Sequence, residues 1–164
     1  ELAERFKSWG IELSIKTISV LERLKTGKKM NCWWCSTQRR TELLHYAIEH
    51  KFNKIALGHH LDDILETLLM NMLERGELST MPPKLSYENY PITILRPLCY
   101  VGEKTLVDYA RLKGFASSVC TCDYQDNSGR KKARRLLEEL TGGSDAKKMR
   151  LFLSLKNIRS EYLP

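Results

Sequence analysis

The chain has 164 residues, of which 42% are hydrophobic, so it has the size of one ordinary domain and can bury a core of its own. It has no apolar run of the roughly 20 residues that span a membrane and no signal-peptide layout, so we expect a soluble, cytoplasmic protein with no membrane partner. Lysine and arginine outnumber aspartate and glutamate by 27 to 20, and the net charge of +7 favours a polyanionic partner such as RNA or a nucleotide.

The first predicted elements are the end of a helix and a strand. Residues 1–10 have the pattern of the last turns of an amphipathic helix closed by Gly10. Residues 11–18 alternate apolar and polar side chains, which is typical of a strand. Because a domain rarely begins with the tail of a helix, we expect one or more strands and helices before Glu1 in the complete protein.

The next elements predict a βαβ unit. The sequence STQRRTELLHYAIEHK predicts a helix that begins near Ser36, and KIALG predicts a short strand buried on both faces. A further helix follows from Leu61 to about Gly76. Its inward-facing side chains are predicted to be Ile64, Leu65, Leu68, Leu69, Met72 and Leu73.

The second half of the chain begins with turn chemistry. Residues 77–91 predict a loop over the sheet edge, ITILRP predicts a strand, and EKTLVDYARLKGF predicts a helix ended by Gly114. A cysteine loop and two helices, at about 129–140 and 145–159, are expected to complete the chain. The predicted fold class is α/β, with a parallel sheet flanked by helices and a helical C-terminal segment.

Five cysteines in a chain without an export signal favour reduced thiols, so we consider metal binding or catalysis before disulfides. Cys32 and Cys35 lie in the turn before a predicted helix, where backbone N–H groups and the helix dipole favour thiolates. A second loop carries Cys120 and Cys122, and the layered fold could bring both loops to one rim. The two loops suit either zinc or an iron-sulfur cluster, with a redox pair or incidental buried cysteines as alternatives. Cys99, in apolar surroundings, predicts a core residue.

A histidine-aspartate turn, Gly58-His59-His60-Leu61-Asp62-Asp63, follows the KIAL strand and opens the next helix. It is therefore expected at the carboxyl edge of the sheet, where open α/β sheets bind ligands. Stabilisation of two carboxylates by the helix dipole is the structural alternative. Tandem histidines beside them favour Mg²⁺ binding, nucleotide contact or acid-base work on a hydroxyl. We predict catalytic roles for His59, His60, Asp62 and Asp63, and nucleotide contacts for Gly58, His59 and Asp62.

Two basic clusters flank the cysteines. Arg39 and Arg40 follow Cys35, and Lys84 lies in the MPPK segment. These side chains would neutralise the phosphates of a bound nucleic acid and fix its register, but they would not recognise its base sequence. A solvated helix face is the alternative. The second cluster, after the cysteine loop, comprises Arg130, Lys131, Lys132, Arg134 and Arg135.

The segments NCWWCSTQRR, KIALGHHLDDILETLLMNML, MPPKL and ILRPLCYVGEKTL, in this order and at these separations, resemble the tRNA 2-thiocytidine biosynthesis proteins of the PP-loop ATP pyrophosphatases over about residues 1–125. The resemblance implies an adenine nucleotide alpha hydrolase-like, Rossmann-like fold. It also implies adenylation by ATP of the O2-bearing carbon of an anticodon-loop cytidine, followed by replacement of the activated oxygen with sulfur. The division that it implies is residues 1–115 for the C-terminal part of the PP-loop domain and 116–164 for the cysteine loop and helical segment.

The resemblance further implies a [4Fe-4S] cluster held by Cys32, Cys35 and Cys120, with Cys122 as the alternative third ligand and zinc as the alternative metal. The implied partners are tRNA, ATP, Mg²⁺ and a sulfur donor, either a small molecule or a cysteine desulfurase, and the family pattern allows a homodimer. A zinc-containing PP-loop ligase or amidase that delivers no sulfur, and a non-catalytic RNA-binding module, stay open as other functions.

The chain departs from the family pattern in two places. Its later cysteine loop reads CxC rather than CxxC, which bears on the third ligand. The phosphate-cradling SGGxDS loop does not occur in the 164 residues. Residues 141–146, TGGSDA, imitate it but follow a helical run rather than a strand, so they predict a helix end and a new N-cap. We favour an omitted upstream segment over a split or degenerate protein as the explanation.

Overall fold

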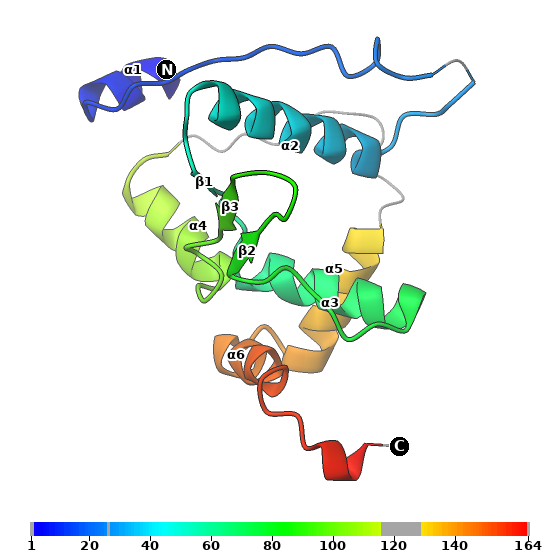
Figure 1. Ribbon diagram of the computed structural model, residues 1–164. Coiled ribbons are helices and arrows are strands. Elements are labelled where there is room, and N and C mark those ends of the chain that lie inside the picture. The colour runs from blue at the N-terminus through cyan, green and yellow to red at the C-terminus, as the bar shows by residue number, and fades with distance from the viewer. Residues whose placement is uncertain (1, 26, 116–128, 164) are drawn as a thin grey trace.

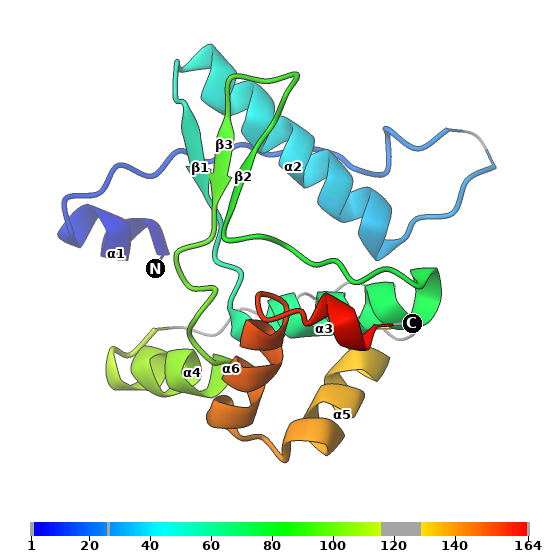
Figure 2. The same ribbon diagram turned by 60° about the horizontal axis from the view of Figure 1, so that its bottom comes forward.

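The computed structural model describes residues 2–25, 27–115 and 129–163. Figure 2 shows α2 lying alongside a small sheet, with α3, α5 and α6 grouped beyond the ends of the strands. None of the helices in the described residues is long and apolar enough to cross a membrane. The elements, labelled in Figure 1, are α1 (Leu2–Ser8), α2 (Cys32–Glu49), β1 (Lys54–Ala56), α3 (Leu61–Arg75), β2 (Lys84–Ser86), β3 (Thr93–Leu95), α4 (Glu103–Leu112), α5 (Gly129–Thr141), α6 (Asp145–Ser154) and the 3-10 helix η1 (Ser160–Tyr162).

The sheet has the strand order β1-β3-β2. β1 pairs with β3 in parallel, with Ile55 opposite Ile94, and helices flank this pair as the predicted α/β class requires. β2 pairs with β3 antiparallel, with Leu85 opposite Ile94, so the described sheet is mixed rather than wholly parallel. The prediction of a loop for residues 77–91 is therefore wrong in part, because its Lys84–Ser86 segment forms an edge strand.

Two strand predictions need correction. Residues 11–18 form no strand among the described elements, and Ile11 and Ile15 are exposed. Alternating side chains favour extended backbone, but a strand also needs hydrogen bonds from a neighbouring strand. β1 was expected to be buried on both faces, yet Lys54 and Ala56 are exposed and only Ile55 is half-buried. β1 lies at an edge of the described sheet, which explains its exposure.

Short-range capping sets the ends of the two helices nearest the predicted site. α2 begins at Cys32, four residues before the predicted start, because the side chain of Asn31 accepts a hydrogen bond from the Trp34 N–H at 2.8 Å. α3 ends as predicted at Gly76, whose φ of 65° is the left-handed conformation that favours glycine. Its last apolar side chains, Met72 and Leu73, were predicted to face inward but are exposed.

The buried apolar side chains form two clusters. The larger, which we call the helical core, surrounds α3 and consists of Leu61, Ile64, Leu65, Leu68, Leu69, Cys99, Ala133, Leu137 and Phe152. The smaller, the sheet core, consists of Ala47, Ile92 and Ile94. Cys99 is thus a core residue, as predicted. Between α5 and α6, Gly142 and Gly143 have positive φ and Ser144 caps α6, which confirms the predicted helix end and N-cap.

Candidate active site at the strand ends

The topology brings the sequence motifs to one edge of the sheet. β1 and β3 run in parallel, so the histidine-aspartate turn after β1 and the ILRP segment after β3 leave the sheet on the same side. β2 runs the other way and therefore begins at this edge with Lys84. Figure 2 shows the Cys32 end of α2 directed to the same side. Three motifs that are separated in sequence thus lie at the edge where open α/β sheets bind ligands, and the cysteine motif is directed to the same side.

The cysteine pair lies inside α2 rather than in a turn before it. Cys32 is the first residue of the helix and Cys35 the fourth, so the two thiols lie on one helical face near the positive end of the dipole. Cys32 is exposed and Cys35 is half-buried. Trp33 is exposed and Trp34 half-buried. The pair is therefore accessible for ligation and is flanked by one indole that faces solvent.

The third predicted ligand, Cys120, and its alternative, Cys122, lie outside the described residues. Within the part of the chain that the structure describes, no group of three histidine, cysteine, aspartate or glutamate side chains could hold a metal ion. The three-cysteine ligand set therefore stays a prediction.

His60 and Asp63 cap α3 together. The ring Nδ1 of His60 accepts from the Asp63 N–H at 3.4 Å, and Asp63 Oδ2 accepts from the His60 N–H at 3.1 Å. This reciprocal capping box satisfies backbone donors at the start of the helix. Capping thus accounts for one histidine as well as for one aspartate, whereas the sequence suggested capping for the aspartates alone. Their catalytic roles stay predictions.

His59 is half-buried, and its Nδ1 is buried without a hydrogen-bond partner among the described residues. Burial lowers the pKa of His59, and this effect prevails although Asp63 acts in the opposite direction. The charges of Arg96, Arg130 and Arg40 lower the pKa of His59 further. At neutral pH the imidazole is therefore uncharged, and it can accept a hydrogen bond or a proton.

Arg96 is a site residue that the sequence reasoning missed. It follows β3 directly, is buried, and donates from Nη1 to the carbonyl of Pro82. Its backbone N–H also donates to the Pro83 carbonyl at 2.8 Å. Arg96 therefore holds the MPPK segment against the end of β3. Its Nε is buried with no hydrogen-bond partner among the described residues. The signal was present, since an arginine directly after a buried strand lies at the ligand-binding edge.

Asp62 is engaged within the protein through both carboxylate oxygens. Oδ1 accepts from Lys148 Nζ at 2.6 Å, and Oδ2 accepts from the Glu103 N–H at 2.8 Å. Burial alone would raise the pKa of Asp62, but the hydrogen bonds from Lys148 and the Glu103 N–H, together with the charge of Lys148, hold the pKa below its ordinary value. Asp62 therefore connects α3 to the start of α4 and to α6. No sequence pattern indicated Lys148 as its partner.

The predicted RNA-binding residues fall into two groups. Arg130 and Arg134 lie against Glu66, which is fully buried on α3. Burial raises the pKa of Glu66, and its hydrogen bond from Arg134 opposes that rise. The second group is exposed and consists of Arg39, Arg40, Lys84, Lys131, Lys132 and Arg135.

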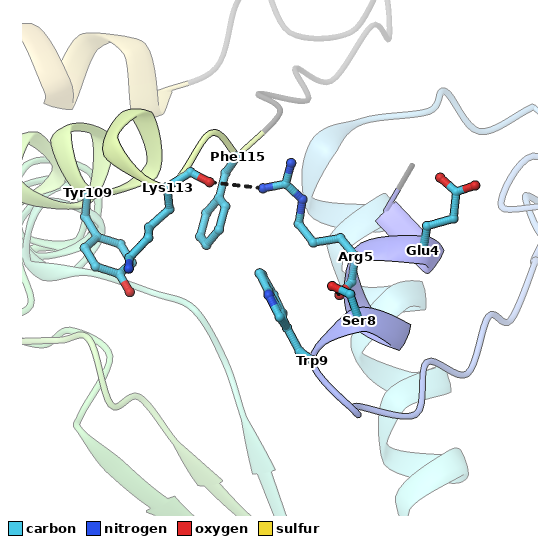
Figure 3. A pocket seen from close by; sticks show the side chains of 7 residues that line it. All are labelled: Glu4, Arg5, Ser8, Trp9, Tyr109, Lys113 and Phe115. Atoms are coloured by element: carbon cyan, nitrogen blue, oxygen red, sulfur yellow. Dashed lines mark hydrogen bonds between the residues drawn. The ribbon is translucent and has the colours of Figure 1, made fainter.

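A cavity of about 770 Å³ lies away from this edge, between α1 and the end of α4 (Figure 3). Trp9 and Phe115 face each other across it with ring centroids 5.6 Å apart, and Arg5 Nη1 donates to the Lys113 carbonyl at 3.3 Å. Its lining residues include none of the predicted site residues. In Figure 1, α1 lies near the end of α2 opposite to the cysteines. The cavity is therefore separate from the candidate site.

Comparison with known proteins relates the chain to tRNA-modifying enzymes. It is 33% identical to tRNA-cytidine(32) 2-sulfurtransferase 1 of Francisella philomiragia subsp. philomiragia over 168 aligned positions, covering 99% of this chain and 65% of that protein. It is 43% identical to the tRNA-cytidine(32) 2-sulfurtransferase of Legionella pneumophila strain Corby over 122 positions, covering 74% and 43%. The chain thus spans less than two thirds of the length of these relatives.

A solved structure and a family model agree with these relatives. The U34-tRNA thiolase NcsA from Methanococcus maripaludis, solved with its [4Fe-4S] cluster, superposes with a TM-score of 0.71 at 25% identity, over 96% of this chain and 56% of that one. This likeness confirms the predicted Rossmann-like fold class. Residues 2–140 match the model of the PP-loop domain. The resemblance that the motifs indicated is thereby confirmed, and the chain belongs to the PP-loop family.

Proposed function

We propose that this chain forms the sulfur-transfer part of an enzyme that converts an anticodon-loop cytidine of tRNA into 2-thiocytidine. The observation that supports the proposal is that His59 and Arg96 follow the parallel strands β1 and β3 at one sheet edge, and that the CxxC end of α2 is directed to the same side. Relatives that are 33% and 43% identical are named tRNA-cytidine(32) 2-sulfurtransferases, which supports cytidine 32 as the target. Such a reaction would take place in the cytoplasm with a small-molecule or cysteine-desulfurase sulfur donor.

The cysteine pair fits an iron-sulfur cluster. Cys32 and Cys35 place two thiols on one accessible helical face at the start of α2. We propose Cys120 as the third ligand, with Cys122 as the alternative. A [4Fe-4S] cluster held by three thiolates would have one iron without a protein ligand, and that iron could bind the sulfur that is transferred. Zinc on the same thiolates is the alternative, and it would leave the site without that sulfur chemistry.

The other residues at the edge have proposed roles that follow from their surroundings. The uncharged His59 is suited to accept a proton or a hydrogen bond from the nucleotide. Arg40 and Arg96 supply positive charge beside it for an anionic group. Of the two aspartates, Asp63 is the better candidate for Mg²⁺ or acid-base work, because both oxygens of Asp62 are engaged in the interior.

ATP requires a phosphate cradle that the described residues do not form. The glycines that imitate the cradle, Gly142 and Gly143, end α5 and lead into the N-cap of α6. No strand precedes them to direct backbone N–H groups at a phosphate. Adenylation by ATP is therefore a proposal from family membership, and we assign no residue of this chain to the cradle.

Formation of 2-thiocytidine tests the proposal directly. In cells whose tRNA lacks 2-thiocytidine, expression of the complete protein should restore the nucleoside, measured by mass spectrometry of digested tRNA. Cys32→Ser should abolish it, whereas Cys99→Ala, which changes a core thiol, should preserve it. If the unaltered protein restores nothing, the proposed reaction is wrong.

Metal analysis distinguishes the cluster from zinc. Anaerobically purified protein should contain iron and inorganic sulfide in equal amounts, whereas a zinc site is colourless and contains no sulfide. Cys120→Ser should lose the iron, and Cys122→Ser serves as the matched control that retains it. The opposite result for this pair would reassign the third ligand to Cys122.

A further inference from the structure

The basic residues of α5 lie on two faces of the helix. Arg130 and Arg134, four positions apart, lie against the carboxylates of α3. Lys132 and Arg135, three positions apart, are exposed. The first pair is therefore the one that connects α5 to the histidine-aspartate turn.

The two arginines that face α3 are held differently. Arg134 donates from Nε to Glu66 Oε1 at 2.7 Å and lies 3.4 Å from Glu103 Oε1. Arg130 lies 3.6 Å from Glu66 Oε2 and 3.7 Å from Asp63 Oδ1, and it makes no hydrogen bond within the described residues. These distances exceed the 2.7–3.2 Å of a good hydrogen bond. Within the described residues, Arg134 is thus held by hydrogen bonds, whereas Arg130 is held by charge attraction alone.

Departure of Arg130 would leave each carboxylate with one hydrogen-bond donor, although the buried Oε2 of Glu66, which has no hydrogen bond within the described residues, would lose the nearby guanidinium. Glu66 would keep its hydrogen bond from Arg134, and Asp63 would keep the one from the His60 N–H at 3.1 Å. Departure of Arg134 is different, because fully buried Glu66 would lose its charged hydrogen-bond donor. Departure of Arg130 therefore leaves the charge of Glu66 with its hydrogen-bonded cation, whereas departure of Arg134 removes that cation.

Arg130 is also exposed to solvent beside the histidine-aspartate turn. Its side chain is 49% exposed, so its guanidinium reaches solvent from the first turn of α5. It is close enough to His59 for its charge to act on that ring. A guanidinium can bind a phosphate through two parallel hydrogen bonds, which the carboxylates 3.6 and 3.7 Å from Arg130 do not match.

We propose that Arg130 is a positioning residue for tRNA that exchanges Asp63 and Glu66 for a backbone phosphate when the RNA binds. The inference rests on the proposed function and names the residue of α5 that couples RNA binding to the site. Arg134 remains on Glu66 and keeps α5 attached to α3. Asp63 and the RNA phosphate then compete for the same guanidinium.

Binding of the full chain to a tRNA that carries cytidine 32, followed by fluorescence anisotropy at several salt concentrations, tests this assignment. Arg130→Ala should weaken binding about tenfold and reduce the salt dependence by about one phosphate contact. Its thermal unfolding midpoint should fall less than that of Arg134→Ala, because Glu66 keeps its hydrogen bond from Arg134. Arg134→Ala should lower the midpoint by about 5 °C or more. Arg111→Ala, an equal charge change on α4, is the control and should alter binding little.

A double-mutant cycle with Asp63 separates partner exchange from a general charge effect. Asp63→Asn should tighten tRNA binding in the unaltered chain, because it removes the competitor for Arg130, and should do so much less in the Arg130→Ala background. An equal gain in both backgrounds would overturn the exchange, as would tRNA binding that Arg130→Ala leaves unchanged. Failure of the unaltered chain to bind tRNA would instead overturn the proposed function, and this inference with it.

Discussion

The ion pair between Asp62 and Lys148 is enclosed by α3, α4 and α6. The two side chains are 6% and 8% exposed, and the Nζ to Oδ1 distance is 2.6 Å. Water cannot solvate either charge if its partner is removed, so the remaining charge would bear its full desolvation cost. Asp63, one residue further along, is half-buried and shares its carboxylate between a backbone N–H and Arg130. Asp62 thus stabilises the fold as half of a buried ion pair, whereas Asp63 stabilises it as a helix cap.

Asp62→Asn should lower the free energy of unfolding by about 3 kcal/mol, because Lys148 would stay buried without its counterion. Asp63→Asn should cost about 1 kcal/mol, the usual cost of a weakened N-cap. Urea unfolding followed by circular dichroism would measure both. The double variant Asp62→Leu with Lys148→Met should be more stable than Asp62→Asn, since no charge is left buried. Equal, small losses for the two single aspartate variants would contradict this division of roles.

At this scale the sequence identified the residues that belong to local patterns. The CxxC pair and the histidine-aspartate turn were found because their members lie within a few positions of one another. Lys148 was missed because its partner Asp62 is 86 positions away, and the residues around Lys148 form no pattern that indicates the contact. Arg96 was overlooked although its position after a strand was informative, since its burial depends on the MPPK segment folding over it.

The extended segment before α2 is attached to that helix by the carboxylate of Glu42 and by a hydrogen bond from the Tyr46 hydroxyl to Ser14 Oγ. Glu42 accepts from Arg23 Nη1 at 2.6 Å and pairs with Lys16 Nζ at 2.8 Å. The hydrogen bonds from Lys16 and Arg23 lower the pKa of Glu42 from 4.5 to about 2. Because the folded pKa lies below the unfolded value, the stabilisation is fully present above about pH 4.5 and is lost as the pH falls towards 2.

Glu42→Gln should loosen residues 11–25 while leaving α2 folded. Hydrogen exchange followed by mass spectrometry, corrected for intrinsic rates, should show faster exchange in this segment at pH 6 than in the unaltered chain. The unaltered chain should approach the variant as the pH falls below 4.5, whereas the variant should show no such change. Glu49→Gln, on the exposed end of the same helix, is the control. Equal exchange in Glu42→Gln and the unaltered chain at pH 6 would rule out this attachment.

Helices were better anticipated than strands for a physical reason. The hydrogen bonds and caps of a helix are local, so Gly76 and the glycines after α5 marked the ends correctly. The start of α2 was misplaced because Asn31 was not recognised as its cap. Strand pairing is long-range, so the alternation in residues 11–18 predicted a strand without a partner, and the edge strand Lys84–Ser86 went unrecognised after two prolines.

On the scale of the whole molecule, the candidate site lies between two cores of unequal size. The helical core holds nine buried side chains among the described residues, and the sheet core holds three. Ion pairs from α5 and α6 to α3 reinforce the helical core. The elements that carry the histidine-aspartate turn are therefore anchored more firmly than the strands, and the site edge is where the two parts meet.

This difference predicts that the two cores open independently. Native-state hydrogen exchange should give α3, α5 and α6 the highest opening free energies and the strands lower ones. Phe152→Ala should remove about 3–5 kcal/mol from the helical core and speed exchange in α3 and α5, because it leaves a cavity between them. Ile94→Ala should speed exchange in β1 and β3 while the centre of α3 keeps its protection. If either variant instead accelerated exchange uniformly through both cores, the chain would unfold as one cooperative unit, and the site would owe its rigidity to the whole fold rather than to α3.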